Sequence, residues 1–167
     1  VTEVDAVPVL NNTINRFAVG FKQKQISVQC FTQDSEMLMP LDVDKFDKIL
    51  TNLVSNALKY SPEESSIKID MAFVDKTSVE TLFADSSGID SDSWLKVVVA
   101  DTGIGIPKDK QKAVFERFYQ IEHSTRQSTW GTGIGLFYTQ QLVNLHYGFI
   151  KCESNTPKGT VFTFVLP

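Results

Sequence analysis

Residues 43–60 read VDKFDKILTNLVSNALKY, and this stretch predicts a long amphipathic helix. Its apolar residues recur every three or four positions, which gathers them on one face of a helix with about 3.6 residues per turn. The members of this face are Phe46, Ile49, Leu50, Leu53 and Ala57. Asp42 precedes the stretch as a candidate N-cap, and Ser61-Pro62 marks its end. The helix therefore needs a partner surface that buries its apolar face.

On both sides of this helix the chain changes between two kinds of hydrophobic pattern. Alternating or short apolar runs predict strands at 26–32, 37–41, 66–74, 95–100, 149–153 and 160–166. Helical spacing predicts further helices at 8–24, 108–118 and 134–147. We expect strand 37–41 to pair with strand 26–32, and Gly148 to end the last helix in left-handed geometry. This order predicts one sheet covered by helices on one face, a two-layer α/β sandwich.

Residues 75–93 make a longer connection than two adjacent strands need. The stretch is rich in Asp and Ser, so we predict a solvated surface insertion. Val79, Leu82 and Phe83 within it need apolar cover, and a small hairpin is the structure that we expect to supply it.

The composition is that of an ordinary globular domain, with 167 residues, 42% of them hydrophobic and 22% charged. The net charge of -4, without a cluster of Lys and Arg, argues against a nucleic-acid partner. No apolar run approaches the roughly 20 residues that a membrane helix needs. Cys30 and Cys152 lie far apart in apolar stretches, and we expect two reduced thiols in the core.

The polar face of helix 43–60 is the first candidate site. Lys48, Asn52, Asn56 and Lys59 fall within about 80° of one another on a helical wheel. Neutral amide oxygens can ligate Mg²⁺, and a Lys ammonium can meet a phosphate. The alternative is a plain solvated helix face.

The second candidate site is Asp101-Thr102-Gly103-Ile104-Gly105-Ile106-Pro107, directly after an apolar strand. Its glycines permit backbone shapes and close approaches that side chains forbid. An Asp at a strand end beside such a loop can accept a hydrogen bond from an exocyclic amine such as adenine N6. The alternative is an ordinary turn between a strand and a helix.

The third candidate site is Gly131-Thr132-Gly133-Ile134-Gly135-Leu136, which opens the last predicted helix. The free N–H groups of a first helical turn and the helix dipole make an anion site, and glycines let a polyphosphate approach the backbone. No Gly-Lys-Ser/Thr follows, so the stretch is not a P-loop. A fourth stretch, Phe115-Glu116-Arg117-Phe118-Tyr119-Gln120, predicts by itself only a helix end with aromatic core residues.

Taken in order, these four stretches resemble the boxes of one family, the catalytic domains of sensor histidine kinases. NLVSNALKYSP, VVADTGIGIP, VFERFYQ and GTGIGLFYTQQLV resemble its N box, first glycine box, F box and second glycine box. The closing KGTVFTFVLP resembles the end of the family pattern. The family belongs to the superfamily shared with gyrase, the heat-shock chaperone ATPase and MutL. The resemblance covers residues 8–167 and implies a Bergerat-type ATP-binding fold, with a mixed, mainly antiparallel sheet covered on one face by about three helices.

The resemblance implies ATP and Mg²⁺ as cofactors, and it assigns roles at matching positions. Catalytic roles fall on Asn52, Lys59 and Arg117, and the Mg²⁺ ligand is Asn56. Asp101 would hold adenine N6, and Phe115 and Phe118 would anchor a lid over the nucleotide. The residues expected around the nucleotide are Asn56, Tyr60, Asp101, Gly103, Gly105, Ile106, Phe118, Gly131, Thr132, Gly133, Gly135, Leu136 and Thr160.

The resemblance also implies an organisation for the chain. Residues 1–167 would form a single catalytic domain, with 75–93 as an insertion and 119–133 as an ATP lid that is mobile without ligand. The helices that dimerise the kinase and carry its phosphoacceptor histidine would be absent, because His123 lies in the lid stretch and His146 near the end of the last helix. We expect a monomeric cytoplasmic fragment, whose partners are those helices and, indirectly, the receiver domain of a response regulator. Whether the parent is anchored in a membrane stays open.

One departure from the family pattern concerns Lys48, which stands where the family usually has an acidic or amide residue. We expect either that Lys48 neutralises phosphate charge, or that the base that assists the attacking imidazole lies on the missing helices. Two alternatives to the kinase remain. An ATP hydrolase of the gyrase or MutL type would need a glutamate in place of Lys48, and a pseudokinase would sense partners without phosphotransfer.

Overall fold

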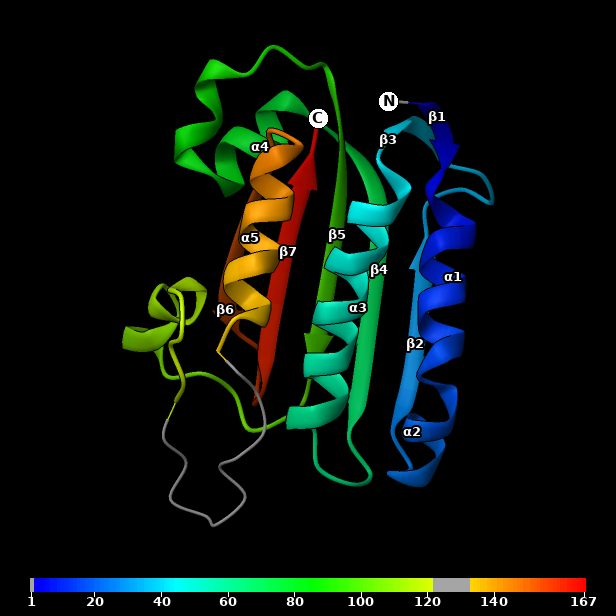
Figure 1. Cartoon of the computed structure of the whole chain (residues 1–167), viewed down its shortest axis with the longest axis vertical. Helices are drawn as coiled ribbons and strands as arrows, with labels where there is room; N and C mark the ends of the chain where they lie inside the picture. Colours follow the sequence, from blue (N-terminus) through cyan, green and yellow to red (C-terminus); the bar gives the residue numbers. More distant parts are fainter. Residues whose placement is uncertain (1, 122–132) are drawn as a thin grey trace.

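The computed structural model describes residues 2–121 and 133–167, and it has an α/β fold (Figure 1). Its strands are β1 (Thr2–Asp5), β2 (Ser27–Thr32), β3 (Leu38–Leu41), β4 (Ser66–Asp75), β5 (Ser93–Asp101), β6 (Phe149–Ser154) and β7 (Thr160–Leu166). Its α-helices are α1 (Ala6–Arg16), α2 (Ala18–Gln23), α3 (Val43–Tyr60), α4 (Lys76–Leu82) and α5 (Gly135–Leu145). Three short 3-10 helices are η1 (Ala84–Gly88), η2 (Lys108–Lys110) and η3 (Ala113–Phe115).

Five strands form the main sheet in the order β2-β4-β5-β7-β6. Strand β2 runs parallel to β4, and the other neighbouring pairs are antiparallel. Helices α1, α3 and α5 lie side by side across one face of this sheet (Figure 1). The mixed, mainly antiparallel sheet, with α1, α3 and α5 on one face, confirms the predicted fold class.

The predicted pairing of strand 37–41 with strand 26–32 is wrong. Strand β3 pairs instead with β1, a strand that the sequence reasoning missed, in a separate two-stranded antiparallel sheet. The Asp5 carboxylate joins the two segments, because its Oδ1 accepts hydrogen bonds from the backbone N–H groups of Val7 (3.0 Å) and Met37 (2.8 Å). Asp5 thereby caps α1 and fixes the start of β3.

The main core lies between the helices and the sheet. Helix α3 buries its predicted apolar face fully, with Phe46, Ile49, Leu50 and Leu53 each 0% exposed. Its predicted N-cap is confirmed, since the Asp42 side chain accepts a hydrogen bond from the Lys45 N–H. Alternate residues of β5 face this core, so the strand carries apolar side chains to the helices along most of its length.

The segment between β4 and β5 is helical, with α4 and η1, and the expectation of a hairpin there is wrong. Val79, Leu82 and Phe83 are spaced three and four residues apart, as on a helix, and Asp75 caps α4 by accepting from the Ser78 N–H at 2.8 Å. A small second cluster buries Val79, Trp94 and Val165. Since Trp94 alternates with the core-facing Leu95, this cluster lies on the sheet face opposite α3.

Other predicted boundaries shift for local reasons. The helix predicted at 8–24 is interrupted at Phe17 (φ -97°, ψ 2°), and the segment 108–118 forms the short helices η2 and η3 instead of one helix. Tyr147 (φ 58°), not Gly148, takes the left-handed conformation after α5. Gly148 is needed for another reason, because a Cβ atom there would overlap the Val165 carbonyl oxygen. Cys152 is buried as expected, but Cys30 is exposed.

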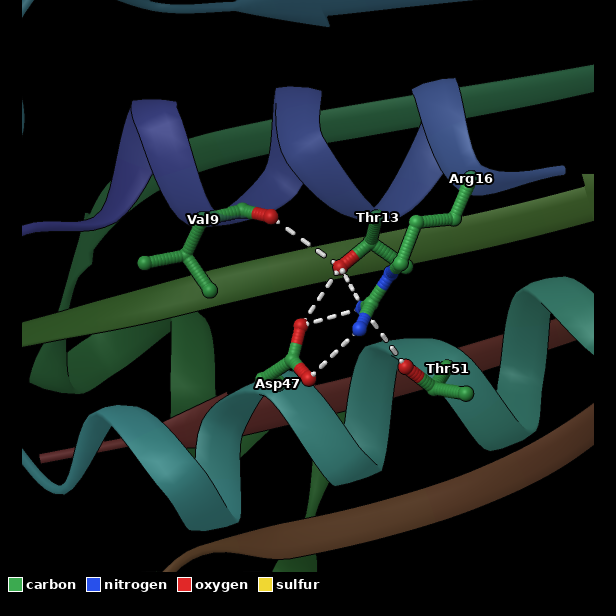
Figure 2. A network of polar contacts seen from close by, with 5 residues as sticks. All are labelled: Val9, Thr13, Arg16, Asp47 and Thr51. Atoms are coloured by element: carbon green, nitrogen blue, oxygen red, sulfur yellow. Dashed lines mark hydrogen bonds and ion pairs between the residues drawn. The ribbon is translucent and has the colours of Figure 1, made fainter. Parts of the chain in front are cut away.

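A polar network joins α1 to α3 (Figure 2). Arg16 donates through Nη2 and Nη1 to the two carboxylate oxygens of Asp47, at 2.5 and 3.1 Å, and through Nη2 to Thr51 at 2.9 Å. The Thr13 hydroxyl also lies 2.9 Å from Asp47 Oδ1. Burial alone would raise the pKa of Asp47, but the hydrogen bonds from Arg16 and Thr13 and the charge of Arg16 bring it below its ordinary value.

We expect Asp47→Asn to lower the free energy of unfolding by about 0.5–1 kcal/mol at neutral pH, since the Arg16 side chain is half exposed and water screens the pair. A carboxyl whose pKa is lowered by folding stabilises the protein above its unfolded pKa of about 3.9, and this contribution is lost as the pH falls through the folded pKa. Urea unfolding at pH 7 and near pH 3 measures the difference. An equal difference between the two proteins at both pH values would contradict this account.

Candidate functional site

The candidate site is built around Asp101, the last residue of β5. The alternation of the strand directs its side chain to the helical face of the sheet, where it is 5% exposed. Asp101 Oδ1 accepts hydrogen bonds from the backbone N–H groups of Gly103 at 2.8 Å and Thr160 at 3.2 Å. Two segments far apart in the sequence, the first glycine box and the start of β7, therefore hold one carboxylate oxygen.

The second oxygen of Asp101 accepts no hydrogen bond from the residues that the structure describes. Burial raises the pKa of the Asp101 carboxyl, and the N–H groups of Gly103 and Thr160 only partly oppose this effect. A buried carboxylate with one oxygen fixed and the other unpartnered is suited to accept a hydrogen bond from a ligand. Asp101 therefore stays the predicted acceptor for an exocyclic amine.

Close backbone approaches explain the glycines around Asp101. A Cβ atom on Gly103 would lie 2.5 Å from the Tyr60 carbonyl oxygen, which accepts from the Ile104 N–H at 3.2 Å. Gly105 (φ 76°) lies against Gly159 (φ 112°). A Cβ atom on Gly159 would overlap the Asp101 carbonyl oxygen. The first glycine box is thus fastened to the end of α3 and to the turn before β7.

Two residues that the sequence reasoning missed support this arrangement. Asn155 Nδ2 donates to the Asp101 carbonyl oxygen at 2.8 Å. Lys24 Nζ donates to the carbonyl oxygens of Leu58 (2.8 Å) and Ser61 (2.9 Å) at the end of α3. A positive charge is favourable at a helix C-terminus, so Lys24 holds the segment that leads into Tyr60. No sequence motif marks either residue, because each acts through a contact distant in the chain.

The polar face predicted on α3 contacts α5 through Asn52. Asn52 and Asn56 are half-buried, and Lys48 is exposed. Asn52 Nδ2 donates to the hydroxyl of Thr139 on α5 at 3.1 Å. Lys59 Nζ lies over the Tyr60 ring, 4.9 Å from its centre, so the side chains of these two predicted site residues are in cation–π contact.

The described parts of the second glycine box begin at Gly133 (φ 67°), whose carbonyl accepts from the Phe118 N–H at 2.9 Å. Gly131, Thr132 and residues 122–130 of the predicted lid, with His123, lie outside the described residues. Gly135 begins α5, and Leu136 packs against the main core, as does Ile106 of the first glycine box. The two ends of the predicted lid segment therefore meet at Phe118.

The aromatic residues of the F box have different surroundings. Phe115 is 7% exposed and packs edge-on against Phe162 at 6.2 Å. Phe118 is 60% exposed, and the Arg117 guanidinium lies 4.7 Å from its ring centre. Within the described ranges, no hydrogen bond or ion pair joins Arg117 to Asn52 or Lys59.

Two further titratable side chains within the described residues are His146 and Cys152. His146 Nδ1 is hydrogen-bonded to the Leu142 carbonyl at 2.8 Å within α5. Burial, followed by the charges of Asp101 and Glu153, raises the pKa of Cys152 to about 12, so its thiol stays protonated at neutral pH.

Over residues 2–121 and 133–167, no group of three or more His, Cys, Asp and Glu side chains could hold a metal ion. None of the helices in these ranges has the length and hydropathy that crossing a membrane requires.

Comparisons with known proteins identify relatives of the chain. Residues 41–167 match the family model described as "Histidine kinase-, DNA gyrase B-, and HSP90-like ATPase". The chain is 33% identical to the sensor histidine kinase WalK of Bacillus subtilis over 98% of its own length and 24% of that protein. It is 31% identical to the adaptive-response sensory kinase SasA of Thermosynechococcus vestitus over 99% of its length and 39% of that protein.

Solved structures share the fold. The catalytic domain of histidine kinase ThkA matches with a TM-score of 0.79 at 24% identity, over 99% of this chain and 94% of that one. The mycobacterial sensor histidine kinase MprB matches with a TM-score of 0.73, over 99% of this chain and 96% of that chain. The chain spans only 24% and 39% of the two curated relatives, so it corresponds to one part of such proteins. The resemblance predicted from its motifs is confirmed: the chain belongs to the family of histidine kinase-, DNA gyrase B- and HSP90-like ATPases, as an ATP-binding catalytic domain of the sensor histidine kinase type.

Proposed function

We propose that this domain binds Mg²⁺-ATP and donates the γ-phosphoryl group to a histidine on helices outside this chain. The observation that carries the proposal is the buried Asp101 carboxylate, with one oxygen held by Gly103 and Thr160 and the other free to accept from adenine N6. Gly105, Ile106 and Tyr60 would complete the adenine side of the site. A carboxylate accepts well from the amine of adenine, and it repels a carbonyl oxygen at the same place.

The phosphate side of the site would be formed by α3 and the start of α5. Asn56, with Asn52 beside it, offers amide oxygens, which are hard ligands that suit Mg²⁺ when phosphates and water complete its coordination. The lack of an acidic metal cluster among the described residues fits this kind of site. Bound there, Mg²⁺ would neutralise phosphate charge. Lys59 would approach a phosphate, and Arg117 could reach phosphate oxygens.

The second glycine box would cradle the phosphates. Gly133 and Gly135 bring the backbone to the first turn of α5, whose free N–H groups and dipole favour an anion. Gly131 and Thr132 precede this turn, and we propose the same role for them. The exposed Lys48 would add positive charge at the edge of the site.

The reaction would break the bond between Pγ and the β–γ bridging oxygen and form a bond between Pγ and an imidazole nitrogen. ADP leaves, and the imidazole gives up its N–H proton. Phosphoryl transfer asks little covalent work of the protein, so catalysis would come from positioning and charge neutralisation. Residues 119–133 would close over the nucleotide as a lid, with Phe115 and Phe118 at its base.

The proposed partners follow from the same reaction. The phosphoacceptor and dimerisation helices of a parent kinase would meet this domain, and a response regulator receiver domain would take the phosphoryl group afterwards. The relatives WalK and SasA are a sensor histidine kinase and a sensory kinase by name. We propose a cytoplasmic location, where ATP is available, and a monomeric state for this domain alone.

The test uses γ-labelled ATP with this chain alone and with the parent protein that includes its helices. A phosphohistidine, which is labile in acid and stable in base, should form on the parent and not on this chain. Steady release of phosphate by this chain alone would favour the ATP hydrolase. Labelling of neither protein, despite bound ATP, would favour the pseudokinase.

A further inference from the structure

We infer that Thr139 is a positioning residue for the phosphate side of the site. Its hydroxyl fixes the orientation of the Asn52 amide and joins the first turn of α5 to α3. The inference rests on the proposed function, in which Asn52 and the start of α5 act on the same phosphates. Thr139 belongs to the stretch that resembles the second glycine box, but the resemblance assigns no role to it.

The contacts form a closed set at the α3–α5 interface. Thr139 is 0% exposed, and its Oγ1 donates to the carbonyl oxygen of Gly135, one turn earlier in α5, at 2.9 Å. The same Oγ1 accepts from Asn52 Nδ2 at 3.1 Å. Asn52 Nδ2 also approaches the Gly135 carbonyl at 3.4 Å. The hydroxyl thus uses its single proton within α5 and offers a lone pair to α3.

This set decides which way the Asn52 amide faces. Because the Thr139 hydroxyl gives its proton to the Gly135 carbonyl, its Oγ1 can only accept from Asn52, and the Gly135 carbonyl can also only accept. The NH₂ group of Asn52 therefore faces α5, and its amide oxygen faces away from α5. That oxygen accepts no hydrogen bond from a residue within the described parts of the chain. It is therefore presented for a ligand, whereas a rotated amide would present a donor to the cation and lose this function.

Valine at position 139 would keep the buried volume but remove the hydroxyl, and serine would keep the hydroxyl. We expect Thr139→Val to weaken ATP binding in the presence of Mg²⁺ by about five- to tenfold, the effect of one lost hydrogen bond. Adenosine, which lacks phosphates, should bind the variant within about twofold of wild type, because the Asp101 side of the site is unchanged. Thr139→Ser should restore ATP affinity.

The experiment measures calorimetric titrations of wild type and both variants with Mg²⁺-ATP and with adenosine. A second readout, without nucleotide, is the ¹H–¹⁵N spectrum of the Asn52 side-chain amide, whose two N–H signals should shift and exchange faster in Thr139→Val alone. Equal weakening of ATP and adenosine would show a merely structural role and overturn the inference, as would unchanged ATP affinity in Thr139→Val.

The two proposals fail in different ways. If wild type binds no ATP, the proposed function is wrong, and the Asn52 amide signals still decide the positioning role. Signals that are the same in wild type and Thr139→Val would then overturn it, and signals altered by valine and restored by serine would support it.

Discussion

Asp101→Asn should weaken ATP binding by at least about tenfold while leaving the fold intact. The asparagine oxygen can still accept from the N–H groups of Gly103 and Thr160. Its NH₂ group then replaces the free carboxylate oxygen and meets the adenine amine donor to donor. A hydrogen bond to a charged group contributes about 1.5–3 kcal/mol, which corresponds to roughly 10- to 100-fold in affinity. Calorimetric titration with ATP measures the change, and Asp109→Asn makes the same substitution on an exposed side chain.

The same variant has an expected pH dependence in the absence of nucleotide. Folding raises the pKa of Asp101, so the native state holds this proton more tightly than the unfolded state. The contribution of Asp101 to the stability of wild type should therefore fall as the pH rises from the unfolded pKa of about 3.9 through the folded pKa. The stability of Asp101→Asn relative to wild type should grow over that window and stay constant above it. A relative stability that declines with rising pH would contradict the raised pKa.

Trp94→Ala should lower the free energy of unfolding by about 3–5 kcal/mol, the range for removing a buried large aromatic side chain. Trp94 is 1% exposed, packs near Phe149 with ring centres 6.1 Å apart, and donates from Nε1 to the Ser91 carbonyl at 3.0 Å. It shares the second cluster with Val79 of α4, so its loss also removes the anchor of the insertion. Denaturant unfolding measures the effect.

A matched control for Trp94 is Phe31→Ala, which removes an aromatic side chain that is 51% exposed and should cost much less. Trp94 and Asp101 stand at opposite ends of β5, about 23 Å apart at the usual rise per residue. Nucleotide affinity should therefore survive in the folded fraction of Trp94→Ala. A loss of less than about 1 kcal/mol would show that the second cluster contributes little to stability.

The sequence predicts the parts of this fold that local periodicity decides. Helix α3 has its apolar stripe, its Asp42 cap and its stop within one continuous stretch, and the structure has the same bounds. Strand pairing is less predictable, because it depends on contacts between distant segments. Strand β3 has a readable pattern, but its partner β1 is selected by the Asp5 contacts to Met37 and to the start of α1. Composition alone indicates a solvated insertion at 75–93, although the spacing of its apolar residues is helical.

The residues of the candidate site likewise fall into those that the sequence predicts and those that depend on distant contacts. Glycines and the Asp at a strand end form short motifs, so Asp101, Gly103 and Gly105 stand out in the sequence alone. Contacts that hold them cannot be read from a motif, and Asn155 and Lys24 were missed for this reason. The orientation of the Asn52 amide likewise depends on α5, 87 residues further along the chain at Thr139.

The most direct test of the central claim is a pair of calorimetric titrations of this chain, one with Mg²⁺-ATP and one with Mg²⁺-GTP. The two nucleotides carry the same phosphates, but guanine presents a carbonyl oxygen where adenine presents an amine. If the free oxygen of Asp101 recognises the base, ATP should bind saturably and GTP at least about tenfold more weakly. Equal affinity for the two nucleotides, or no binding of ATP, would contradict an adenine site at Asp101.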